Sequence, residues 1–186
     1  MNLLKSLIRA VAGAALVVPL LAPVTPASAS TMDAAPYVRI TLNAIIPWRT
    51  LGNNGDEIFV KISGPGLIPL TTMTYRVWPP SNAVLPVNSG YCYSFENAPC
   101  PPGSDDSRSW TVGTASKPVF LANGGLATIN IRDNDVIFAD DDVFLQSFHL
   151  NPLTQESRYT LRPNAGRTDT SDYQVNITLT PSMTPF

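Results

Sequence analysis

The sequence predicts an all-β protein built as a single antiparallel β-sandwich of about eight strands. Short runs in which apolar and polar residues alternate recur from about residue 37 to residue 180, and this is the period of a half-buried strand. Asn, Gly and Pro cluster between the runs, as expected for turns. No stretch after residue 30 keeps a helical period over twelve or more residues, and proline, with 18 copies in the chain, breaks helices. The length is sufficient to bury an adequate core.

Residues 1–29 are expected to be a signal peptide and not part of the fold. Lys5 and Arg9 form a positive start, Ala10–Ala22 form a short apolar core, and Ala27-Ser28-Ala29 is a small-residue cleavage pattern. The alternative is an uncleaved membrane anchor, which the shortness of the apolar run disfavours. We therefore expect cleavage after Ala29, a secreted, extracellular protein, and one domain spanning residues 30–186.

The charge of this expected mature chain argues against a nucleic-acid partner. Removal of Lys5 and Arg9 leaves ten basic residues against fourteen acidic ones, a net charge of −4. A basic patch, the electrostatic mark of nucleic-acid binding, is absent. We expect a soluble monomer.

The first predicted strand is Tyr37–Ile45, in which Val38, Ile40 and Leu42 alternate with polar residues. Further strands are predicted, in chain order, at 57–63, 117–122, 126–132, 143–150, 157–161 and 172–180, with less regular ones at 75–78 and 110–112. Asn123-Gly124-Gly125 predicts a hairpin turn, because Asn and Gly accept positive φ at low cost. The irregular stretch at about 79–106 is expected to be an insertion.

Cys92 and Cys100 are expected to form a disulfide. They flank a turn-rich stretch that can double back, and an exported chain meets an oxidising compartment. The alternatives are a metal-binding thiolate pair or a redox couple, but the chain has no second cysteine pair and its one histidine, His149, is distant in sequence. Closure of so short a loop would stabilise the fold by roughly 2.5 kcal/mol in the chain-entropy model.

The segment from Asp133 to Asp142 holds five of the fourteen acidic residues. Carboxylates crowded this closely repel one another unless a cation neutralises them. Ca²⁺ takes six to eight oxygen ligands from flexible loops, so this inter-strand loop is a candidate Ca²⁺ site. The alternative is a solvated acidic loop that opposes aggregation or pairs with Arg132.

Two motifs resemble those of C2 domains, the calcium-dependent lipid-binding β-sandwiches, and a bacterial secreted branch of that fold in particular. Asp133-x-Asp135 followed after five residues by Asp141 is similar to the third calcium loop of that family, and Asp56–Ile62 is similar to the strand that follows its first calcium loop. Phe144-Leu-Gln-Ser-Phe148 resembles the family segment after the loop, although Val143 and Gln146 replace its usual aspartate and glycine.

The resemblance implies a Ca²⁺ site with Asp133, Asp135 and Asp141 as its core ligands. Supplementary ligands would come from four further acidic residues, Asp56, Glu57, Asp140 and Asp142. If the site is like those of other extracellular modules, its dissociation constant would be on the order of 10⁻⁴ to 10⁻³ M.

Apolar residues beside the two candidate loops are candidates for membrane contact. Val136, Ile137 and Phe138 lie between the flanking aspartates, where family members carry residues that enter membranes. Ile45-Ile46-Pro47-Trp48 is expected at the tip of the other candidate loop. Tryptophan favours bilayer interfaces. The alternative is that these side chains simply belong to the core.

The function expected from these observations is that of a secreted, non-catalytic, Ca²⁺-binding module that docks to a membrane surface, a glycan or a protein. No Gly-x-Ser-x-Gly, His-Glu-x-x-His or phosphate-binding glycine loop is present. A metal-free structural or protein-interaction sandwich is the alternative from another class. A carboxylate-dependent extracellular hydrolase is a third, and it would need two acids facing each other across a cleft.

Overall fold

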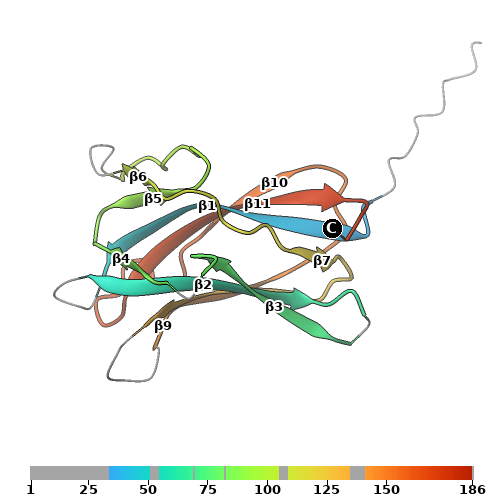
Figure 1. The fold of residues 1–186 in the computed structure, drawn as a ribbon, viewed down its shortest axis with the longest axis horizontal. Helices are drawn as coiled ribbons and strands as arrows, with labels where there is room; N and C mark the ends of the chain where they lie inside the picture. The colour runs from blue at the N-terminus through green and yellow to red at the C-terminus, as the bar shows by residue number, and fades with distance from the viewer. Residues whose placement is uncertain are drawn as a thin grey trace, which may run out of the picture. The chain divides into compact units, whose positions relative to one another are not determined.

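Two β-sheets face each other across a hydrophobic core in the computed structural model of the chain (Figure 1). The structure describes residues 34–50, 55–68, 70–81, 83–104, 109–134 and 141–185, and for Asp141 it describes the backbone only. All regular elements in these ranges are strands, which confirms the predicted all-β sandwich. None of the described residues belongs to a helix of the length and apolarity needed to cross a membrane.

The first sheet is centred on its two longest strands, β1 (Tyr37–Arg49) and β11 (Asp172–Ser182), which pair antiparallel. On the far side of β11 lies β10 (Ser157–Leu161). On the other side of β1, β7 (Val119–Leu121) pairs with its first residues and β5 (Cys92–Ser94) with its later ones. The outermost strand, β6 (Ser109–Thr111), pairs parallel with β5.

The second sheet runs in the order β3 (Thr72–Trp78), β2 (Asp56–Pro65), β8 (Leu126–Asp133), β9 (Asp141–His149), and all of its pairs are antiparallel. Strand β4 (Leu85–Val87) pairs with the first residues of β2, whereas β3 pairs with the later ones. Every strand predicted from the sequence has a counterpart in one of the two sheets.

Alternation of apolar residues places the core between the sheets. Val38, Ile40 and Leu42 of β1 point inward, and the inward residues of β8 are Ala127, Ile129 and Ile131; all six are at most 1% exposed. Aromatic side chains fill the space further along, with Trp78 and Phe95 in an edge-to-face pair whose ring centroids are 5.2 Å apart. Burial of this surface is the main term that stabilises the sandwich.

The turn Asn123-Gly124-Gly125 does not close the hairpin that the sequence predicts. Gly124 has the expected positive φ of 81°, but β7 before the turn pairs with β1, whereas β8 after it pairs with β2 in the other sheet. The predicted hairpin is therefore wrong, and the segment is an arch between the sheets. The turn residues specify a reversal of the chain. The strands on either side join different sheets, because Phe120 of β7 and Ile129 of β8 enter the shared core from opposite sides.

The stretch 79–106 carries the short strands β4 and β5 between irregular segments. Its later part lies against the outer face of the first sheet, where Cys92 and Ala44 form a small second core with Ile46. Cys92 and Cys100 form the expected disulfide, with their Cα atoms 6.1 Å apart. The disulfide is consistent with an oxidising compartment.

Candidate functional site

Candidate Ca²⁺ ligands from distant parts of the sequence meet where β2 begins and β8 ends. In the register of the second sheet, Ile58 lies opposite Asp133, and Asp133 lies opposite Asp141. The backbone N–H of Glu57 donates a hydrogen bond of 2.8 Å to Oδ1 of Asp133, although 76 residues separate them. The structure thus brings the stems of the two candidate loops together, as the motif resemblance implies.

Asp56, the first residue of β2, is buried, with only 2% of its surface exposed. Its Oδ2 accepts a hydrogen bond of 2.5 Å from the hydroxyl of Tyr173 on β11. Burial, reinforced by the charges of Asp56 and Asp133, raises the pKa of Tyr173 above its usual value. The phenol is therefore held protonated, and it serves as a permanent donor to the carboxylate.

Asp142, at the start of β9, has its own partners on β8. Its Oδ1 lies 3.1 Å from Nε of Arg132 and accepts a hydrogen bond of 3.0 Å from Nδ2 of Asn130. Both members of the ion pair are partly exposed, so its net contribution to stability is small, at most about 1 kcal/mol. Pairing with Arg132 is the alternative that the sequence suggested for the acidic segment, and Asp142 is the residue that makes this pair.

The remaining predicted ligands are only partly covered by the structure. Asp135 and Asp140 lie outside the described residues, as do the membrane-contact candidates Val136, Ile137 and Phe138. Among the side chains that are described, no three His, Cys, Asp or Glu residues gather closely enough to hold a metal ion. The core ligand set therefore stays a prediction.

Trp48 lies within β1 and not at the tip of a loop, where the sequence predicted it. Its indole N–H donates to Oε1 of Gln174 at 3.2 Å, and the guanidinium of Arg162 lies 4.9 Å from the centre of its ring. Arg162 in turn makes a two-point ion pair with Asp172, a buried residue at the start of β11. Trp48 is half-buried in this arrangement on the outer face of the first sheet.

Tyr173 is the residue of the site that sequence reasoning missed. Its position in the alternation of β11 identifies an inward, core-facing side chain, which the structure confirms. The signal that could have singled it out is a tyrosine among aliphatic core residues, because a buried phenol usually needs a hydrogen-bond partner. The partner, Asp56, lies 117 residues away and could not be identified from the sequence.

No protein-family model matches the sequence, and no curated protein matches it significantly. Solved structures do. The first of the C2 domains of plant extended synaptotagmin 1 is 10% identical, with 80% of this chain and 97% of that chain covered and a TM-score of 0.47. A structure of CC2D1B is 10% identical, with 83% and 60% covered and a TM-score of 0.49.

Human GIVD cytosolic phospholipase A2, solved in complex with methyl gamma-linolenyl fluorophosphonate, is also 10% identical. The match covers 82% of this chain at a TM-score of 0.46, but only 18% of the phospholipase chain, so this protein spans less than a fifth of it. The synaptotagmin domain is of the C2 type, which is the type that the sequence motifs resemble. At these identities and TM-scores, no residue role or activity is transferred from these proteins.

Proposed function

We propose that this protein is a non-catalytic binding module that binds Ca²⁺ at its acidic end and then docks to a membrane or another cell surface. The observation that carries the proposal is the hydrogen bond from the Glu57 N–H to Asp133, which joins the acidic start of β2 to the end of β8, where the acidic loop begins. Crowded carboxylates at such a junction are destabilised by mutual repulsion, and a divalent cation would relieve it.

The chemistry of the donor set suits Ca²⁺. The candidate ligands at this junction all offer carboxylate oxygens, which are the hard ligands that Ca²⁺ prefers, and loops can supply the six to eight that it needs. Asp133, Asp135 and Asp141 would hold the ion, with Asp140, Asp142, Asp56 and Glu57 as supplements. Asp56 would contribute a ligand from the core side of the site, since it is buried and accepts a hydrogen bond from Tyr173.

Docking would follow from neutralisation of the acidic loop. With Ca²⁺ bound, the loop carrying Val136, Ile137 and Phe138 would approach an anionic surface with less repulsion, and these apolar side chains would enter it. Trp48 would join them only by giving up its contacts with Gln174 and Arg162.

The test is the melting temperature of the purified protein in EDTA and in millimolar Ca²⁺, with Mg²⁺ as the control ion. A ligand at about 100 times its dissociation constant adds about 2.7 kcal/mol, which raises the melting temperature by several degrees. We expect a Ca²⁺-specific rise that is lost in the double variant Asp133→Asn/Asp135→Asn. The matched control is Glu156→Gln, an exposed acid in the connection before β10, which should keep the rise.

A second candidate function, a metal-free structural or interaction module, is favoured by the partners that two of the acids already have. Asp142 pairs with Arg132, and Asp56 accepts from Tyr173. In that case 10 mM Ca²⁺ would leave the melting temperature unchanged, and the double variant would match or exceed the wild type, because it removes repulsion. That result would overturn the Ca²⁺ proposal. If Ca²⁺ does bind, sedimentation with anionic vesicles then tests the docking step.

A further inference from the structure

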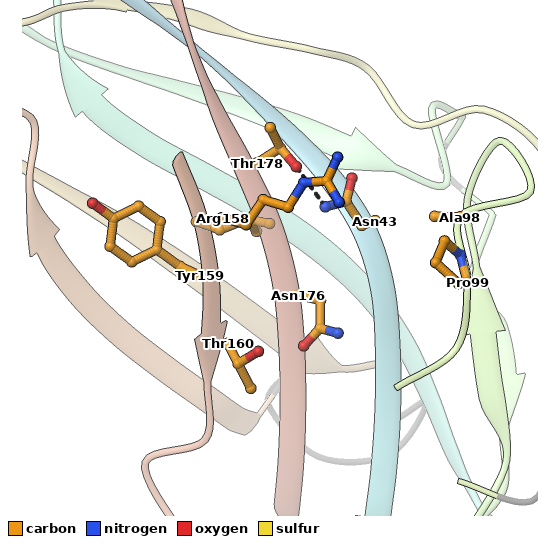
Figure 2. A pocket seen from close by; sticks show the side chains of 9 residues that line it. Asn43, Ala98, Pro99, Arg158, Tyr159, Thr160, Asn176 and Thr178 are labelled. Carbon is orange, nitrogen blue, oxygen red and sulfur yellow. Dashed lines mark hydrogen bonds between the residues drawn. The ribbon is translucent and has the colours of Figure 1, made fainter. Parts of the chain in front are cut away.

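A pocket of about 390 Å³ opens on the outer face of the first sheet (Figure 2). Its floor is made by outward side chains of three adjacent strands: Asn43 of β1, Asn176 and Thr178 of β11, and Thr160 of β10. Its volume falls within the range of about 300 to 1,000 Å³ that is typical of ligand sites. None of these residues belongs to the acidic end described above.

Asn43 lies at an irregularity in β1. The pairing of β1 with β11 shifts between Leu42 and Ala44, so Asn43 is the extra residue of a β-bulge. Its Nδ2 donates a hydrogen bond of 2.7 Å to Oγ1 of Thr178, drawn as a dashed line in Figure 2. Bulges redirect side chains and are common beside functional sites.

The lip of the pocket is fixed to this floor. Ala98 and Pro99 form it, and the next residue, Cys100, is tied by the disulfide to Cys92 of β5. The N–H of Phe95 donates to the carbonyl of Asn43 at 2.9 Å, and that of Ala98 donates to the carbonyl of Phe95. The disulfide and these bonds hold the apolar lip against the polar floor, which makes the pocket largely preformed.

Arg158 is the charged side chain in the lining of the pocket, and it already has a partner. It is highly exposed, and its Nε lies 3.2 Å from Oε1 of Glu156. An anionic ligand would have to replace Glu156 at this guanidinium, so we expect the pocket to favour a neutral ligand.

We propose that this pocket binds a short neutral saccharide. The floor offers both donors and acceptors, since an amide presents both C=O and NH₂ and a threonine hydroxyl can do either. A sugar hydroxyl also donates and accepts, so it suits such a mixed set better than a purely anionic or purely apolar ligand does. The apolar lip of Ala98 and Pro99 would cover the C–H face of a sugar ring. Tyr159 also contributes to the lining, but its ring is directed away from the floor side chains (Figure 2) and stacks on Phe148 with the centroids 6.4 Å apart.

The experiment is an amide chemical-shift titration of the disulfide-bonded protein, in EDTA, with maltotriose, cellotriose, chitotriose and mannotriose. We expect at least one of them to bind with a dissociation constant in the millimolar range or tighter, with the largest shifts at Asn43, Thr160, Asn176 and Thr178. The double variant Thr160→Val/Asn176→Ala should weaken this binding at least tenfold. Thr74→Val, an exposed strand threonine on the outer face of the other sheet, is the matched control and should leave it unchanged.

Three results would overturn the proposal. The first is the absence of binding by all four neutral trisaccharides at 10 mM. The second is binding that survives the double variant unchanged, which would place the ligand elsewhere. The third is binding of trigalacturonic acid alone, which would make the site one for carboxylates held by Arg158. The titration in EDTA keeps its outcome independent of whether the acidic end binds Ca²⁺.

Discussion

At the scale of single residues, the pair formed by Asp56 and Tyr173 links the core to the acidic end. A buried carboxylate is costly unless it is hydrogen-bonded, and Tyr173 provides such a bond from the opposite sheet. The pair lies directly beside Glu57, whose N–H holds Asp133. The position of the candidate Ca²⁺ ligands therefore depends on a side chain that is itself part of the core.

Tyr173→Phe should destabilise the protein by about 1 to 3 kcal/mol. The ring keeps its packing, but the buried Asp56 carboxylate loses one hydrogen bond, and a hydrogen bond to a charged group contributes about this much. Equilibrium unfolding in urea measures the change. Tyr159→Phe, at a partly exposed tyrosine on edge strand β10, is the matched control and should change stability by less than about 0.5 kcal/mol. Equal effects of the two variants would contradict this role for the hydroxyl.

The same hydroxyl should make the protein sensitive to alkali. Burial raises the pKa of Tyr173 in the folded state, whereas in the unfolded chain it ionises near 10. The unfolded state then binds fewer protons than the folded state above pH 10, so this contribution to stability is complete below pH 10 and is lost as the pH rises beyond it. Tyr173→Phe should reduce the fall in stability by about 1 kcal/mol between pH 10 and 11, and the difference should approach about 1.4 kcal/mol per pH unit above that. Parallel curves for wild type and variant would show that Tyr173 does not titrate this way.

The residue-level prediction from the sequence succeeded where local pattern was sufficient. Val38, Ile40 and Leu42 are buried because alternation alone decides which face of a strand they take. The roles of Asp56 and Tyr173 could not be predicted in the same way, because a hydrogen bond across the sandwich leaves no trace in local spacing. Trp48 illustrates the same limit, because it was predicted at a loop tip but lies in β1, where Arg162 and Gln174 contact it.

At the scale of elements, turns decide how the strands enter the site. Gly55 precedes Asp56 directly and has a φ of 83°. A Cβ on Gly55 would lie 2.2 Å from the carbonyl oxygen of Val87, a backbone atom that cannot move aside easily. This glycine is therefore required both by its dihedral angle and by the close approach of β4.

Gly55→Ala should cost clearly more stability than Gly166→Ala. Both glycines have positive φ, so alanine is strained at either position and should cost about 1 kcal/mol or more. At Gly166, however, nothing lies within 4 Å of the added Cβ, whereas at Gly55 the Val87 carbonyl must shift. Urea unfolding of the two variants separates dihedral strain from steric conflict. Equal losses of stability in the two variants would mean that β4 can shift away from the added Cβ at no measurable cost in free energy.

The turn at Asn123-Gly124-Gly125 shows why elements are easier to predict than their pairing. The positive φ of Gly124 follows from the residue type. Whether the flanking strands pair with each other or join different sheets depends on where Phe120 and Ile129 find apolar partners, which is a property of the whole core. The short strands β4 and β5 went unpredicted because they lie among the proline and turn residues of the stretch 79–106, and β4 itself contains Pro86.

At the scale of the whole molecule, the alternating strands determine a sandwich, and the sandwich brings two sequence-distant acidic stems together at Glu57 and Asp133. The fold class was predictable because the strand period and turn residues recur along the chain. The outer-face pocket was not, because it needs side chains of three strands and the disulfide-bonded lip at once.

The disulfide and the N-terminal segment make a joint prediction about export. Expressed with residues 1–29 in a secreting bacterial host, the protein should be recovered outside the cytoplasm with Ser30 as its first residue and with Cys92 and Cys100 oxidised, because an Ala-x-Ala pattern directs cleavage and the oxidising compartment permits the bond. Mass spectrometry without reduction measures both changes together. Ala29→Asp should block cleavage, since the site requires a small residue, while Ala34→Asp, beyond the site, should not. An uncleaved wild-type chain recovered in the membrane fraction would instead indicate that residues 1–29 act as an anchor.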